Sequence, residues 1–307
     1  MSAISSVVVE DLEQAKDVWN ALSPHESLYD EWEFRRLFYN PAKSALRFIV
    51  AKDSSNKPIA LLPLQQSTIQ GSLTLEFFGG QFMECNRLFT HPMHSELSLE
   101  DFLSVLPGNY WLDYIIPMDE FTKNLPLDDY AYSLPIAGYT NVADFFAKKI
   151  DSDSIRQAIR KLLLHPFTFR EGTFEDLSPM VLLLEKQFGT ESLFAEPAYL
   201  AALRTLLEGD IPCDFRVLCS GGVPVSFAFS VLYAGCYYFL ATATDRSAYK
   251  DIGKLIIYHV IDRAISKGCS HVEAAAGDCG WKERWEFERI PLHEYKSGVP
   301  SQEEGRE

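Results

Sequence analysis

The hydrophobic and polar positions follow one order twice along the chain. In the first half, apolar runs at residues 47–52 and 59–64 enclose a polar turn. In the second half, runs at 216–219 and 225–231 enclose a turn that begins with two glycines. Apolar, β-branched and aromatic runs around a Gly, Asn or Pro turn are typical of β-hairpins, so each half is predicted to contain one.

Both halves then continue in the same way. The predicted elements are a third strand at 73–78 and 236–242, a helix at 97–106 and 252–267, and a closing strand at 111–116 and 271–276. In the second helix the apolar residues recur at helical spacing, and Gly268 is a natural stop. Further helices are predicted upstream of the hairpins, at 11–22, 31–39, 143–163, 177–188 and 199–207. The order predicts an α/β (α+β) fold of mixed, largely antiparallel sheets flanked by helices, present twice.

The two copies set the expected domain organisation. Pro135, Gly138 and polar neighbours interrupt the pattern near residues 133–141. We therefore predict an N-terminal half at 1–138 and a C-terminal half at 139–296. Residues 297–307 are polar and are predicted to be a disordered tail.

Composition excludes several classes of function. The net charge is −15, from 28 basic and 43 acidic residues, which disfavours binding to DNA. The 6 cysteines are scattered without metal-ligand spacing, so we expect reduced structural thiols and no metal site. No apolar run is long enough to span a bilayer, and the first residues lack the pattern of a signal peptide, which predicts a cytoplasmic protein. Motifs typical of hydrolases, NTPases, zinc proteases and dinucleotide-binding enzymes are missing as well.

Four passages of the second half resemble the CelD/BcsL-like acetyltransferases, a branch of the GNAT superfamily related to the FemABX peptidyltransferases. These passages are the basic helix with Ser154, Arg156, Arg160 and Lys161, the Gly221-Gly222 turn, the helix start around Gly253, and the segment from Gly277-Asp278 through Trp281-Lys282 to Trp285. Residues 59–64 and 78–80 resemble the degenerate first copy of that family. The resemblance implies a tandem GNAT-like fold and N-acyl transfer from acyl-CoA or from aminoacyl-tRNA.

The resemblance places the acyl donor in the second half. A strand at 236–245 would polarise the thioester carbonyl through a free backbone N–H, with Thr242 and Thr244 on that strand. The CoA pyrophosphate would bind at a helix start, where N–H groups are unpaired. The residues predicted to hold it are Arg246, Lys250, Ile252, Gly253 and Lys254. Asp251 stands where the family pattern has its middle glycine, and a carboxylate there would repel phosphate unless neighbouring cations offset it.

Four residues are candidates for the chemistry on the acceptor amine. Asp278 would act as general base or amine anchor, or alternatively as a helix N-cap. Lys282 would bind an anionic group of the substrate, or alternatively lie in solvent. Glu273 and Tyr238 lie on neighbouring predicted strands. A buried carboxylate such as that of Glu273 needs a partner or a function, whereas a tyrosine on a strand commonly serves only to pack the core. Trp281 and Trp285 would share one face of a following helix.

The sequence therefore predicts an N-acyltransferase that uses acetyl-CoA or another acyl-CoA as co-substrate and needs no metal. The acceptor is expected to be an amine on a small molecule, a sugar or a cell-envelope precursor. Two alternatives remain. One is an aminoacyl-tRNA-dependent transferase with Arg156, Arg160 and Lys161 along a tRNA groove, and the other is a non-catalytic binding protein that kept the fold and lost the donor site, which Asp251 favours.

Overall fold

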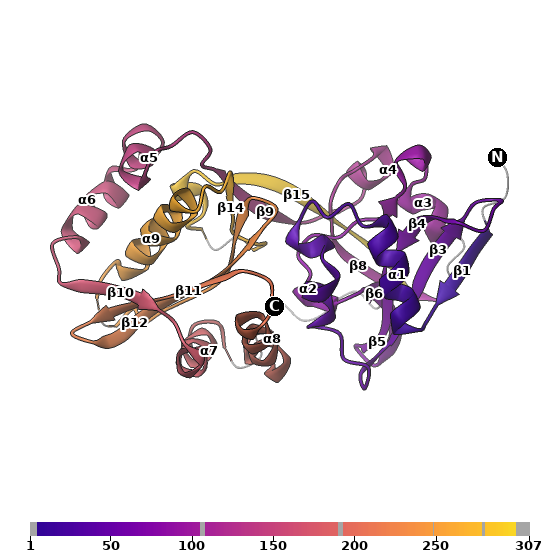
Figure 1. The fold of residues 1–307 in the computed structure, drawn as a ribbon, viewed down its shortest axis with the longest axis horizontal. Coiled ribbons are helices and arrows are strands. Elements are labelled where there is room, and N and C mark those ends of the chain that lie inside the picture. The colour runs from indigo at the N-terminus through magenta and orange to yellow at the C-terminus, as the bar shows by residue number, and fades with distance from the viewer. Residues whose placement is uncertain (1–4, 105–107, 190–192, 248, 278–279, 299–307) are drawn as a thin grey trace, which may run out of the picture. The chain divides into compact units, whose positions relative to one another are not determined.

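A computed structural model describes residues 5–104, 108–189, 193–247, 249–277 and 280–298. The chain forms two compact units (Figure 1). The first unit comprises Met1–Tyr130 together with Pro291–Glu307, and the second comprises Ala131–Ile290. The domain bounds predicted at residues 138 and 296 stay predictions. Within the described residues no helix is both long and apolar enough to cross a membrane.

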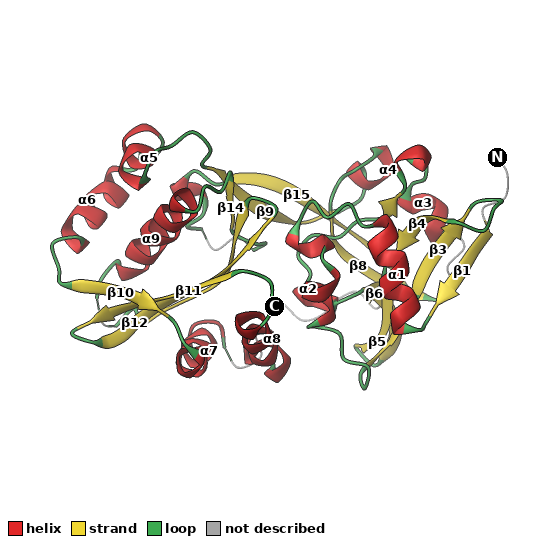
Figure 2. Cartoon of the chain, in the orientation of Figure 1, coloured by secondary structure: helices red, strands yellow, loops and turns green. Residues whose placement is uncertain are grey.

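Figure 2 shows the helices and strands of both units. The first unit contains β1 (Ser5–Val9), α1 (Leu12–Leu22), η1 (Leu28–Asp30), α2 (Trp32–Arg36), β2 (Ser44–Leu46), β3 (Phe48–Lys52), β4 (Pro58–Leu62), β5 (Leu64–Ile69), β6 (Ser72–Phe77), η2 (Gly80–Phe82), β7 (Phe89–Thr90), η3 (Pro92–His94), α3 (Leu99–Leu103), β8 (Asn109–Ile115) and α4 (Glu120–Lys123). Strand β9 (Leu127–Pro135) runs from the first unit into the second, and β15 (Glu288–Ser297) runs back. The second unit contains α5 (Val142–Lys148), α6 (Asp153–Leu162), β10 (Phe167–Glu171), α7 (Phe174–Phe188), η4 (Leu193–Ala195), α8 (Pro197–Glu208), β11 (Cys213–Ser220), β12 (Val223–Tyr233), β13 (Cys236–Thr244), α9 (Ile252–Ser266), β14 (His271–Glu273) and η5 (Glu283–Trp285).

The core of the first unit consists of two hydrophobic clusters, one on each face of a sheet. Strands β1, β3, β4 and β7 form one sheet, in which β3 and β4 are the antiparallel hairpin predicted from the sequence. Phe48 and Val50 of β3 pack in a cluster with Trp19 of α1, whereas Ile49 and Ala51 pack in the opposite cluster. Successive side chains of a strand point to opposite faces, so both faces of this sheet are buried.

The second unit is built on a sheet in the order β10-β11-β12-β13-β14-β9. Its first strands pair antiparallel, and the hairpin β11–β12 is the one predicted from the sequence. Strand β14 is parallel to β13, because the long helix α9 connects them as a crossover. Helix α9, with α6 and α5 against it, packs on one face of the sheet, and α7 with α8 packs on the other (Figures 1 and 2).

Several predicted elements need correction. The helix predicted at 143–163 is two helices, α5 and α6, separated by a short connection. The closing strand predicted at 271–276 ends at Glu273, and Ala275 already has a φ of 59°. A helix carrying Trp281 and Trp285 on one face is wrong, because only the 3₁₀ turn η5 forms there and Glu286 takes a left-handed conformation. Strand β5 pairs with β6 along its whole length and was not predicted.

Candidate functional site

The parallel strands β13 and β14 pair over three residues only. Cys236 lies opposite His271, and the last pair joins Tyr238 to Glu273. Strand β13 continues to Thr244, but among the described residues none pairs with its β14 side beyond Tyr238. An open strand edge therefore begins in the middle of the sheet.

A bulge interrupts β13 directly after this point. Phe229 of β12 lies opposite Ala241, and Ser230 lies opposite Phe239, so Leu240 has no partner on β12. An extra residue of this kind is left out of the ladder and bends its strand. An unpaired backbone N–H group at a strand edge can polarise a carbonyl oxygen, which makes this part of β13 a candidate position for a thioester.

The open edge leads to the first turn of α9. Thr244 ends β13, and its Oγ1 lies 2.7 Å from Ser226 Oγ. A Cβ atom added to Gly253 would lie 3.8 Å from Thr244 Oγ1. The end of β13 and the start of α9 are therefore adjacent, as the sequence predicted for a donor-binding loop.

Asp251 occupies the N-cap of α9 in a left-handed conformation, with φ 66° and ψ 7°. Glycine adopts this conformation most easily, and Asp is one of the few other residues that tolerate it. Its side chain makes no hydrogen bond to the helix and lies 3.0 Å from Lys254 Nζ. The carboxylate that would repel a phosphate is thus paired with a cation, and the backbone keeps the shape that a glycine would give.

The other residues predicted for the donor lie on the same path. Arg246 and Lys250 are exposed in the loop, and Ile252 is buried as the first residue of α9. The Thr242 hydroxyl donates to Phe227 O at 3.1 Å, so it stabilises the hairpin. The loop is anchored through Tyr249, whose hydroxyl lies 2.9 Å from Ser220 Oγ.

Glu273 lies beside the open edge on the face of the sheet opposite α9. Its Oε1 accepts a hydrogen bond of 2.7 Å from the Ser133 hydroxyl, and its register neighbour Tyr238 is buried. Burial raises the pKa of the Glu273 carboxyl above its ordinary value, while the Ser133 bond and the charge of His271 partly lower it. A raised pKa makes the carboxylate a stronger base, which suits it to accept a proton from a substrate.

Lys282 is buried and holds the turn that follows β14. Its Nζ donates to Ala275 O at 3.0 Å and to Ala276 O at 2.8 Å. The same ammonium lies 4.5 Å from the centroid of the Tyr132 ring. These contacts give it a structural task, and the predicted contact with substrate stays a prediction. Asp278 lies outside the described residues.

A family profile matches part of the second unit. Residues 152–283 match the family described as the acetyltransferase (GNAT) domain. The match contains the open edge, α9 and Glu273. Residues 152–283 form a GNAT acetyltransferase domain of the CelD/BcsL-like family. The family resemblance stated from the sequence is confirmed, and a GNAT domain implies an acyl-CoA co-substrate.

Solved structures show that the GNAT-like fold extends over both units. The crystal structure of FemX has a TM-score of 0.61 at 8% identity, over 95% of this chain and 96% of that one. The L-PGS from Bacillus licheniformis has a TM-score of 0.58 at 13% identity, over 96% and 94% of the two chains. A tandem GNAT protein from the clavulanic acid biosynthesis pathway has a TM-score of 0.57 at 10% identity, over 97% and 100%. The predicted tandem GNAT-like fold is thus confirmed. A search of curated protein sequences found no significant match.

Sequence reasoning missed a buried polar cluster in the GNAT domain. Asp214 accepts hydrogen bonds from Arg263 Nε at 2.9 Å, from the Tyr237 hydroxyl at 3.1 Å and from Arg216 Nε. Next to it, the His259 ring stacks on Phe169 at 3.7 Å between centroids. Burial lowers the pKa of His259 to about 4, and the two arginines add to this effect. The cluster joins α9 to β11, and the sequence signals for it were His259 and Arg263 within an otherwise apolar helix.

Proposed function

We propose that this chain is an N-acyltransferase that moves an acyl group from acyl-CoA to an amine, and that the reaction takes place in the second unit. The observation that carries the proposal is the open edge of β13 beyond Tyr238, which leads to the start of α9. The GNAT domain found over residues 152–283 supports the same reaction class. The proposed acceptors are amines of small molecules, sugars or cell-envelope precursors.

The donor is proposed to lie along the open edge. The amide groups of its pantetheine arm would pair with β13 as an added strand does. The thioester carbonyl would then reach the bulge at Leu240, where backbone N–H groups stabilise the negative charge of the tetrahedral intermediate. The pyrophosphate would be held at the first turn of α9 by Gly253, with Arg246, Lys250 and Lys254 supplying positive charge.

Glu273 is the proposed general base. The neutral amine attacks the thioester carbon through its nitrogen and forms the C–N bond, the C–S bond breaks, and CoA leaves as a thiolate that takes up the proton released by the amine. The proton lost by the amine passes to the Glu273 carboxylate, directly or through one water. Tyr238 is the register neighbour of Glu273, and Lys282 holds the turn after β14. Asp278 stays predicted as general base or amine anchor.

The tRNA-dependent alternative finds less support. Arg156, one of the three residues assigned to a tRNA groove, donates from Nε to Ile150 O at 2.6 Å and lies over the carbonyl end of α5. Its guanidinium therefore caps a neighbouring helix. Arg160 and Lys161 are exposed, and two cations are a small site on a chain of charge −15. The similarity to FemX shows the fold alone.

The test is the release of free CoA thiol from acetyl-CoA in the presence of a panel of primary amines. At least one amine should accelerate thiol release, and Glu273→Gln should reduce the rate by about 10²–10⁴-fold. Glu283→Gln is the matched control, because Glu283 is an exposed carboxylate that pairs with Arg289 of β15. A Glu273→Gln variant that is folded and as active as the wild type would exclude Glu273 as the base. Absence of binding of any CoA thioester would instead support the non-catalytic alternative.

A further inference from the structure

The first unit contains a counterpart of the open edge. Strands β6 and β8 are parallel and pair at Thr74 with Asn109 and at Leu75 with Tyr110. The paired residues have the same sequence separation as Cys236 and His271 in the second unit. Both units therefore carry a short parallel pair whose strands part after a few residues, and each could in principle admit an acyl donor.

In the first unit the chain itself fills this place. The Asn86 amide donates to Tyr114 O at 2.8 Å, and Asn86 O accepts from the Ile116 amide at 2.9 Å. These bonds form a parallel bridge between Asn86 and Ile115. Ile115 pairs on its other side with His293 of β15, so Asn86 lies on the side of β8 that faces β6. The backbone of Asn86 thus pairs with β8, the counterpart of β14, on the side from which β6 has parted.

One buried arginine holds this segment in position. Arg35 is 0% exposed, and its Nη1 donates to Asn86 Oδ1 at 2.8 Å and to Phe78 O at 2.9 Å. Its Nη2 donates to Cys85 O at 2.9 Å. Phe78 directly follows β6, so the guanidinium spans from the end of β6 to the segment that lies on β8. A planar group with five donors is suited to such a bridge, and a lysine could not reproduce it.

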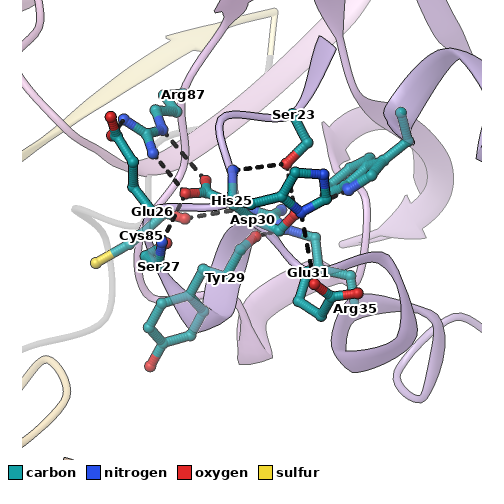
Figure 3. A network of polar contacts seen from close by, with 11 residues as sticks. Ser23, His25, Glu26, Ser27, Tyr29, Asp30, Glu31, Arg35, Cys85 and Arg87 are labelled. Atoms are coloured by element: carbon teal, nitrogen blue, oxygen red, sulfur yellow. Dashed lines mark hydrogen bonds and ion pairs between the residues drawn. The ribbon is translucent and has the colours of Figure 1, made fainter. Parts of the chain in front are cut away.

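A second buried pair fixes the end of the segment. Arg87 Nη2 lies 2.5 Å from Asp30 Oδ2, and Arg87 Nη1 lies 2.9 Å from Glu26 Oε2 (Figure 3). The carboxyl of Asp30 is only 1% exposed. We name residues 83–87 the plug segment. Arg35 holds its middle and Arg87 its end, so displacing it would strip several buried charged groups of their partners, which is costly.

Helix α3 lies between β6 and β8 in the sequence, as α9 lies between β13 and β14. It lacks the features of a phosphate-binding helix. Helix α3 has 5 residues, whereas α9 has 15. Its N-terminus is closed by a capping box in which Asp101 Oδ2 accepts from the Ser98 amide at 2.9 Å. A carboxylate of the protein therefore already lies at the N-terminus of α3, whereas the Asp251 side chain makes no cap bond to α9.

We infer that the plug segment closes the donor site of the first unit, so that one chain binds one acyl-CoA, in the second unit, and that Arg35 is the positioning residue that keeps the plug seated. The count of one donor rests on the proposed function. The closure rests on the contacts of the first unit alone.

Two measurements test the two parts separately. Hydrogen exchange followed by NMR should show the Asn86 and Ile116 amides strongly protected, with the same protection when acetyl-CoA is saturating. Rapid exchange of either amide, or a loss of protection on adding the donor, would overturn the closure. Isothermal titration with acetyl-CoA should give one site per chain, and two sites would overturn the inference. If no acetyl-CoA bound, the proposed function and the count would both fail, and the closure would still be decided by the exchange data.

A variant tests the role of Arg35. Arg35→Lys keeps the charge but loses the planar fork, and it should speed exchange of the Asn86 and Ile116 amides at least about 10-fold while amides of α9 keep their rates. Arg36→Lys is the matched control, because Arg36 is only half-buried and its Nη1 reaches Tyr39 O at a long 3.4 Å. If Arg35→Lys does not fold, Asn86→Ala tests the same point by removing the acceptor of Arg35. Wild-type protection of Ile116 in a folded variant of either residue would show that the plug does not depend on Arg35.

Discussion

The hydroxyl of Ser133 donates to Glu273 Oε1 at 2.7 Å, and this bond joins two residues that are 140 positions apart in the sequence. Ser133 lies on β9 and Glu273 on β14, where the two residues are register partners. The bond fixes the carboxyl beside the open edge of β13. It also stabilises the charged form of the carboxyl and so partly offsets the burial that raises its pKa.

Removing this bond should shift the pH dependence of the reaction. In Ser133→Ala the Glu273 carboxylate loses a donor, so the pKa of the carboxyl rises further. A bond with a net value of about 1 kcal/mol corresponds to about 0.7 pH unit. The acid limb of kcat/KM should therefore move to higher pH by about that amount, while the rate on the alkaline plateau changes little. An unchanged limb, measured with the same amine, would mean that Glu273 is not the group that titrates.

Replacing Glu273 should change how the free energy of unfolding depends on pH. The pKa of Glu273 is raised in the folded state, so its contribution to stability is present below its ordinary value of 4.5 and is lost as the pH rises through the folded value. Glu273→Gln cannot ionise, and its amide oxygen can still accept from Ser133. The variant should gain stability relative to the wild type between pH 4 and pH 8, as measured by urea unfolding. A difference that is independent of pH would show that the carboxyl is not desolvated.

Lys282→Met should destabilise the second unit. The methionine fills similar space, but it leaves the carbonyls of Ala275 and Ala276 without their ammonium donor. Loss of bonds to a charged group predicts about 1.5–3 kcal/mol of destabilisation. Lys267→Met is the control, because Lys267 is exposed at the end of α9, and it should stay within about 0.5 kcal/mol of the wild type. Equal free energies of unfolding of the two variants in urea would contradict the structural role assigned to Lys282.

The lowered pKa of His259 predicts that the folded protein loses stability in mild acid. Its folded pKa of about 4 lies below the ordinary 6.5, so the unfolded chain binds the proton first. The stability linked to this group is therefore present above pH 6.5 and is lost as the pH falls towards 4. His259→Phe keeps a ring to stack on Phe169 and should lose less stability than the wild type over this window. The exposed His165→Gln should follow the wild type, and a His259→Phe curve parallel to both would reject the prediction.

The repeated hairpins, β13 and α9 followed from the sequence because each carries its own periodic pattern or turn residues. Strand β9 did not, since Asp128, Asp129 and Pro135 make it look like a linker until β14 pairs with it. The bulge at Leu240 has no local signal either, because it depends on the register between two strands. Both features depend on pairing between strands that are far apart in the sequence, and this pairing cannot be derived from local patterns in one sequence.

Part of the position of the candidate site in the fold could be predicted. Gly253 lies in the first turn of α9 and Glu273 on β14, as expected, because both positions follow from the order of elements. Their roles stay predictions. The task of Lys282 was not foreseen, since it depends on the left-handed turn at Ala275. The closure of the first unit was not foreseen, because Arg35 meets Asn86 across 51 residues and neither belongs to a recognisable motif.

The central claim is that the start of α9 binds the phosphates of acyl-CoA, and a thermal-shift titration with acetyl-CoA tests it most directly. A ligand that binds only the folded state raises the melting temperature with its occupancy. Space beside Gly253 allows a side chain, so Gly253→Gln and Gly253→Glu should both fold, and they differ only by one negative charge. We predict a saturable shift for the wild type, a weaker one for Gly253→Gln and none for Gly253→Glu. No shift for the wild type, or equal shifts for the glutamine and glutamate variants, would contradict the claim.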